Sequence, residues 1–128
     1  MNPEYLHVLF RAQMPESVIT TSFGVITACN PDGKNQTDGD NQIATESLQR
    51  ALQEEGLVHF PVIGGSPDFT HQEAGFGVIW NSSNEAVAWG RKFQQEAIFW
   101  VEKGIVYLIS CAGQNSLRVG KWDDLCDA

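Results

Sequence analysis

Two apolar runs near the C-terminus, at residues 97–101 and 105–111, constrain the fold of this chain more than any other feature. The dipeptide Lys103-Gly104 turns the chain between them, and so short a connection produces a β-hairpin. Parallel strands would need a crossover of about a dozen residues or more. The two runs therefore predict a sheet that is at least partly antiparallel.

Three further strands are predicted upstream of the hairpin, at residues 17–29, 57–63 and 75–80. The first is rich in β-branched and aromatic residues, a composition that favours strands. It also fits two short strands broken near residue 21 or 22, and it ends at the turn sequence NPDG. Residues 2–10 fit a short helix, and a strand using Leu6, Val8 and Phe10 is the alternative.

Two helices are predicted from apolar residues that recur at helical spacing. The first runs from residue 40 or 41 and ends at Gly56. The second begins with Ser82 and Glu85, which form a capping box, and frays near Gln95. The tail at residues 112–128 is expected to lie over the core as an irregular arm or a short helix.

The predicted element order is β-α-β-β-α-β-β, which indicates the α+β class. We expect a single domain over residues 1–128, with two helices packed on one face of a mostly antiparallel sheet of about five strands. The length of 128 residues is ordinary for one domain with a real core.

Charge and hydropathy narrow the classes of function. The net charge is −8, and the cationic residues are scattered singly apart from Arg91-Lys92, which argues against binding of extended nucleic acid. A single nucleotide or a flipped base stays open. No apolar run reaches the roughly 20 residues of a membrane span, and the N-terminus lacks a signal-peptide pattern. We therefore expect a cytoplasmic protein without membrane contact.

Three sequence blocks resemble a known family. They are FGVITACNP at residues 23–31 followed by Gly33, SPD at residues 66–68 with His71 and Glu73, and GRKFQQEAIFWV at residues 90–101. In this order they are similar to the bacterial family of domain of unknown function 3293, over about residues 1–111. The resemblance implies a small, stand-alone, cytoplasmic bacterial protein. The family has no established activity, so the resemblance implies no mechanism.

The segment at residues 66–73 carries the densest group of proton-handling side chains. In an extended chain His71 and Glu73 point to the same side, where a carboxylate can orient an imidazole as a general base. Asp68 joins them if the chain turns, so these three are the candidate catalytic residues. The alternative is a turn held by Asp68, with His71 bonded inside the loop.

Four further residues are candidates for ligand binding. Asn30 follows a strand and offers a donor and an acceptor, although an Asx turn also explains it. Ser66 follows two glycines that could form a backbone nest for phosphate or simply end a strand. Arg91 and Gln95 lie one helical turn apart, either facing the ligand or facing water.

No metal or other cofactor is expected. The sequence lacks the second cysteine motif of zinc deaminases, the HExxH motif and the spacing of a calcium loop. Cys29, Cys111 and Cys126 are widely spaced, which is typical of free thiols rather than a zinc knuckle.

Two hypotheses for function follow from the sequence. The first is a domain that binds a polar small molecule or nucleotide, with catalysis through the His71, Glu73 and Asp68 loop left open. The second is an acidic interaction module, such as an adaptor, immunity protein or inhibitor, which binds a basic protein partner through electrostatic attraction. Convergence in space of the three polar blocks, around Asn30, at residues 68–73 and at residues 91–95, would favour the first.

Overall fold

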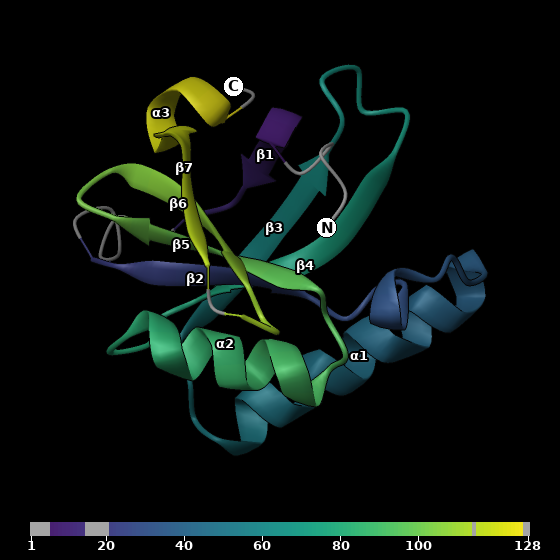
Figure 1. Cartoon of the computed structure of the whole chain (residues 1–128). Helices are drawn as coiled ribbons and strands as arrows, with labels where there is room; N and C mark the ends of the chain where they lie inside the picture. Colours follow the sequence, from purple (N-terminus) through teal and green to yellow (C-terminus); the bar gives the residue numbers. More distant parts are fainter. Residues whose placement is uncertain (1–5, 15–20, 114, 127–128) are drawn as a thin grey trace.

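One antiparallel sheet organises the computed structural model, which describes residues 6–14, 21–113 and 115–126. Its strands are β1 (Leu9–Ala12), β2 (Phe23–Thr27), β3 (His59–Gly65), β4 (Gln72–Val78), β5 (Ala97–Glu102), β6 (Ile105–Ser110) and β7 (Ser116–Lys121). In this part of the chain they lie in the order β1-β3-β4-β2-β5-β6-β7, and the sheet curls into a half-barrel (Figure 1).

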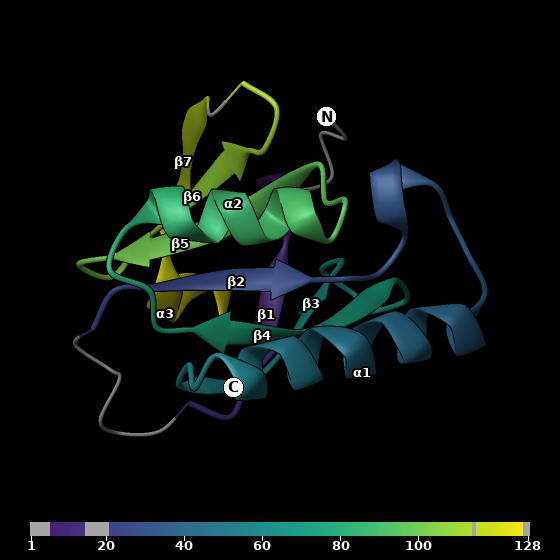
Figure 2. The same cartoon turned by 90° about the horizontal axis from the view of Figure 1, so that it is seen from below.

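Helices cover both faces of the sheet. They are α1 (Asp38–Glu54), α2 (Ser83–Lys92) and α3 (Trp122–Leu125), and a 3-10 turn, η3, spans Pro31–Gly33. Figures 1 and 2 show α1 and α2 on the same side of the sheet, and Figure 1 shows α3 on the other side. Among the described helices, none is long and apolar enough to cross a membrane.

The sheet has an apolar core on each of its two faces. Under α1 and α2, the outer face contributes residues such as Ile26, Phe76 and Ile98, which pack against Leu48 and Leu52 of α1. The inner, concave face carries Phe10, Phe23, Phe60 and Val62, together with Trp122 of α3. Residues two apart along a strand share a face, so each strand feeds both cores alternately.

An aromatic contact closes the half-barrel. The ring of Trp122 stacks on Phe10 at a centroid distance of 5.1 Å and meets the edge of Phe23 at 5.2 Å. Phe10 of β1 also forms a parallel bridge with Cys126, which follows α3. The first described strand and the end of the described chain thus meet across the inner face.

The predicted five-stranded sheet with two helices is wrong, because the described chain has a seven-stranded curled sheet and three helices. The two extra strands lie at the sheet edges. β1 takes the place of the end of the predicted N-terminal helix, at Leu9 and Phe10, where the Phe10 side chain packs in the inner core. β7 lies in the tail, where an arm or helix was predicted, since it pairs with β6 along most of its length. Residues 2–5 and 17–20 lie outside the described part.

Replacing Phe10 with alanine tests the closure of the half-barrel. The Phe10 side chain is 0% exposed, so Phe10→Ala removes a buried ring and leaves a cavity beside Trp122. We expect a loss of about 3–5 kcal/mol in the free energy of unfolding, measured by chemical denaturation. Leu6→Ala is the control, because Leu6 is 41% exposed and its removal should change stability by less than about 0.5 kcal/mol. Equal effects of the two substitutions would contradict the closure.

Candidate functional site

Three segments distant in sequence meet on the hydroxyl of Thr27, at the end of β2. Its Oγ1 lies 3.0 Å from Oε1 of Glu73 on β4 and 3.0 Å from Oε1 of Gln95, which connects α2 to β5. The Gln95 Nε2 group donates to the carbonyl oxygen of Cys29 at 3.1 Å. We call Thr27, Cys29, Asn30, Glu73 and Gln95 the Glu73 cluster.

Strand register explains why Thr27 and Glu73 come together. Thr27 pairs with Gly75 across β2 and β4, and Glu73 lies two residues from Gly75 on the same face. A Cβ atom on Gly75 would collide with the carbonyl oxygen of Ile26 and the side chain of Thr27. Glycine is therefore required for the close approach of the two strands beside the cluster.

Asn30 fastens the end of β2 to α1. Its Oδ1 accepts from the Asn41 Nδ2 group at 3.1 Å and from the backbone N–H of Gln36 at 3.0 Å. In return, Asn41 Oδ1 accepts from the backbone N–H of Asn30 at 2.9 Å. Because both bonds of Oδ1 are occupied, the amide nitrogen of Asn30 is the part of that side chain left to face Glu73, whose pKa it helps to lower.

Backbone strain surrounds the cluster. Asn30, Asp32 and Gln94 have φ angles of 49°, 58° and 58°, in the left-handed region that non-glycine residues seldom occupy. The loops that carry them touch, since the Asp32 backbone N–H donates to the Gln94 carbonyl at 2.7 Å. Strained backbone of this kind often accompanies functional sites, because surrounding structure must hold it in place.

Burial sets the electrostatics of the cluster. It raises the pKa of Glu73, and contacts with the side chains of Thr27 and Asn30 act in the opposite direction. Burial also raises the pKa of the Cys29 thiol, which contacts Thr45 Oγ1 at 3.8 Å and the Ala74 carbonyl at 3.6 Å. A thiol kept protonated is a poor nucleophile, so Cys29 has the properties of a packed core residue.

Asp68, Ser66 and His71 form a self-contained hairpin loop between β3 and β4. Asp68 Oδ1 accepts from the Ser66 hydroxyl at 2.9 Å and from the Thr70 hydroxyl at 2.8 Å. The backbone N–H of Ser66 donates to the His71 carbonyl at 2.9 Å. These contacts match the turn alternative, and of the predicted catalytic residues Glu73 is the one that the structure brings to Thr27.

The base of this loop is packed rather than open. Phe69 is 8% exposed, its ring fits over Gly65, and the guanidinium of Arg11 lies 3.7 Å from the ring centroid. The loop is therefore shaped by the burial of one aromatic side chain, with Asp68 and His71 exposed on its surface.

Arg91 and Gln95 face different surroundings, although they lie one helical turn apart in sequence. The Arg91 Nε group donates to the carbonyl oxygen of Cys111 at 2.6 Å, at the end of β6. Helix α2 ends at Lys92, and the left-handed Gln94 redirects the chain so that Gln95 reaches Thr27. The prediction that Arg91 and Gln95 share a face depended on α2 continuing to Gln95.

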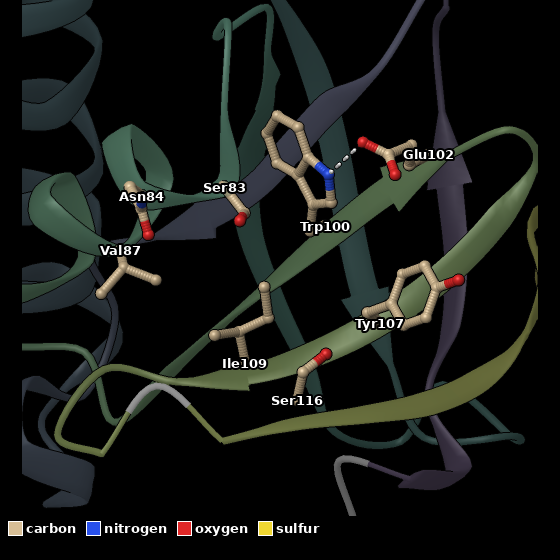
Figure 3. Close-up of a pocket in the computed structure, with 8 residues that line it drawn as sticks. All are labelled: Ser83, Asn84, Val87, Trp100, Glu102, Tyr107, Ile109 and Ser116. Carbon is tan, nitrogen blue, oxygen red and sulfur yellow. Dashed lines mark hydrogen bonds between the residues drawn. The ribbon is translucent and has the colours of Figure 1, made fainter.

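Two cavities lie outside the cluster. One of about 310 Å³ is lined by residues of α2, β5, β6 and β7, namely Ser83, Asn84, Val87, Trp100, Glu102, Tyr107, Ile109 and Ser116 (Figure 3). The other, of about 320 Å³, is lined by residues that include Trp80, Trp89, Glu55 and Glu85. Neither is lined by any of the candidate catalytic residues (His71, Glu73 and Asp68) or the candidate ligand-binding residues (Asn30, Ser66, Arg91 and Gln95). Within the described ranges, no group of three or more His, Cys, Asp or Glu side chains is placed to hold a metal ion.

Thr27 and Asn41 are the cluster contacts that sequence reasoning missed. Thr27 sits in an apolar run, where threonine is an ordinary strand former. The first helix was predicted to begin at residue 40 or 41, but its cap is Thr37, whose hydroxyl accepts from the Asp40 N–H, so Asn41 lies inside the helix. The turn sequence NPDG marks the end of the strand and so places Asn30 there, but nothing in the sequence indicates that Asn41 contacts it.

Comparison with known proteins gives one match. The model of a family described as "Protein of unknown function (DUF3293)" matches residues 26–98, which confirms the resemblance seen in the sequence. The matched range contains every member of the Glu73 cluster. No curated protein and no solved structure matched the chain.

The hydrogen bonds of the loop between β3 and β4 predict that the contribution of Asp68 to the stability of the fold depends on pH. Hydrogen bonds from the Thr70 backbone and hydroxyl, and from the Ser66 hydroxyl, lower the pKa of Asp68 to about 2. The folded pKa is depressed, so the contribution to stability is present above the unfolded value of about 3.9 and is lost as the pH falls towards 2. We expect Asp68→Asn to be less stable than the wild type at pH 7, with the gap closing between about pH 4 and 2 in denaturation experiments.

Asp124→Asn is the matched control, because Asp124 is also exposed but lies on α3, away from the loop. A gap between wild type and Asp68→Asn that stays constant from pH 7 to about 2 would contradict the assigned hydrogen bonds.

Proposed function

The chain belongs to the DUF3293 family, and we propose that it binds a polar small molecule or nucleotide at the Glu73 cluster. One observation carries the proposal: Glu73 and Gln95, which lie 46 and 68 residues from Thr27 along the chain, meet on the same hydroxyl. A turn or a cap is built from neighbours in sequence, whereas this cluster requires β2 and β4 to be in register and the turn at Gln94 to bring Gln95 to the same hydroxyl.

The groups in the cluster suit recognition of a polar ligand. Asn30 and Gln95 supply amides, Thr27 a hydroxyl and Glu73 a carboxyl group, so donors and acceptors alternate over a short distance. Thr27, Asn30, Glu73 and Gln95 are all partly buried, and a hydrogen bond in such surroundings is electrostatically stronger than in water. Base edges, sugars and amides present the complementary groups.

Acid–base chemistry at this site would fall to Glu73. Burial moves its pKa upward, towards the range in which a carboxyl group can both give and take a proton near neutral pH. Asp68 makes its side-chain hydrogen bonds inside the hairpin loop, and Cys29 stays a protonated thiol. The proposed site therefore contains an acid–base group and is not arranged for covalent catalysis.

The interaction-module hypothesis is favoured by a different observation. Ile43 on α1 is 66% exposed, and the exposed carboxyl groups of Asp40 and Glu46 lie three residues to either side of it. A basic partner with an apolar anchor would fit this surface. Under this alternative, Ile43→Ser would impair the protein and substitutions in the Glu73 cluster would not.

A ligand screen tests the proposed site. Nucleosides, nucleotides, sugars and amides are added to the wild-type protein, and the unfolding temperature is measured. A ligand at 100 times its dissociation constant should stabilise the protein by about 2.7 kcal/mol. We expect Glu73→Ala to abolish this stabilisation, because it removes the central hydrogen-bonding group.

Tyr107→Ala is the matched control, because it alters the cavity of Figure 3 and leaves the cluster intact. Binding that persists in Glu73→Ala and disappears in Tyr107→Ala would assign the ligand to that cavity and overturn the proposed site.

A further inference from the structure

If Glu73 is ionised, Thr27 has one hydroxyl hydrogen for two acceptor oxygens. A threonine hydroxyl carries one hydrogen, yet Thr27 Oγ1 lies 3.0 Å from two oxygens, one on Glu73 and one on Gln95. If both were acceptors, they would compete for that hydrogen. One of the two must therefore supply a hydrogen of its own for both contacts to be full hydrogen bonds.

The orientation of the Gln95 amide decides which group supplies it. Its Nε2 group donates to the carbonyl oxygens of Cys29 and Phe93, both at 3.1 Å. Turning the amide over would place its oxygen against two carbonyl oxygens, which only accept. Gln95 therefore presents Oε1 to Thr27 and takes the Thr27 hydrogen.

We infer that Glu73 carries a proton in the folded protein, as a neutral carboxylic acid that donates to Thr27 while Thr27 donates to Gln95. The three side chains then form one directed chain in which every oxygen contact has its hydrogen. This state deepens the proposed function, on which its role rests: Glu73 becomes the proton carrier of a site without formal charge.

The surroundings of Glu73 favour this state. Burial is the main influence on its pKa and acts upward. Opposite it in the sheet lies Gly64 of β3, and the Cys29 thiol beside it is protonated because burial raises its pKa as well. The hydrogen bonds of Glu73 with the side chains of Thr27 and Asn30 act in the opposite direction, and burial is the larger influence.

The inference narrows the ligand class to uncharged polar molecules. A neutral cluster of amides, a hydroxyl and a carboxylic acid gives little attraction to a metal ion or an organic cation, whereas it complements a base edge, a sugar or an amide. Ionisation of Glu73 would leave one Thr27 hydrogen for two acceptors, and so would weaken the contact that holds Gln95.

Carboxyl NMR on the free protein tests the protonation state directly. Glutamate labelled with ¹³C at the side-chain carboxyl is titrated from acid to alkaline pH, with Glu73→Gln used to assign the Glu73 signal. A midpoint above about pH 7 supports the inference, because Glu73 then carries its proton at neutral pH, whereas an unperturbed glutamate titrates near about 4.3. A midpoint at or below about pH 7 overturns it, and indicates one Thr27 hydrogen shared between an ionised Glu73 and Gln95.

A stability profile provides a second measurement. Because the folded pKa of Glu73 is raised, the folded state binds more protons than the unfolded state above about pH 4.3, and stability falls as the pH rises through this window. Glu73→Gln keeps a neutral donor and does not titrate. The folding equilibrium constant of the wild type relative to Glu73→Gln should fall by up to about tenfold per pH unit.

Glu46→Gln is the matched control, because Glu46 is an exposed glutamate on α1, outside the cluster. A Glu73→Gln ratio that stays constant across this pH window, or that follows the Glu46→Gln ratio, would overturn the inference. Neither measurement uses a ligand, so a protonated Glu73 in a protein that binds nothing in the screen would refute the proposed function alone.

Discussion

The stack of Trp122 on Phe10 is the contact on which the rest of the structure depends, because it joins the last helix to the first described strand across the concave face. An open sheet of seven strands would present β1 and β7 as edges, and unpaired edges are templates for association. Aromatic burial draws the two ends together, and the bridge between Phe10 and Cys126 adds a backbone contact to the closure.

The inner face of the sheet changes from apolar to polar along the length of its strands. On the inner face, Phe23 and Val25 of β2 belong to the dry core, and the next residue on that face is Thr27, where the polar cluster begins. Neighbouring β4 shows the same change, from Gly77 against the Phe60 ring to Glu73 against Thr27. A single face thus runs from aromatic packing to hydrogen bonding, and this explains why a carboxyl group is partly buried at its end.

Sequence reasoning found the polar blocks but not the group that joins them. Asn30, Glu73 and Gln95 were predicted because each adjoins a strand end, and the structure brings them together. Thr27 could not be distinguished from the other β-formers of its strand without knowledge of register. The edge strands were missed for a related reason: β7 is mostly exposed, so it lacks the apolar alternation that marks a half-buried strand. Local turn chemistry explains the hydrogen bonds of Ser66, Asp68 and His71. The sequence itself already indicated this turn as the alternative to a catalytic loop.

The single hydrogen of Thr27 links the fold to the chemistry. Strand register fixes its distance to Glu73, the left-handed turn at Gln94 fixes its distance to Gln95, and the amide of Gln95 is held by two backbone carbonyls. Each of these constraints comes from a different element, and together they hold the Glu73 and Gln95 oxygens 3.0 Å from the Thr27 hydroxyl. The remaining freedom is the proton on Glu73. In a cluster assembled in this way, the protonation of Glu73 sets the direction of the hydrogen bonds that join β2, β4 and the turn after α2.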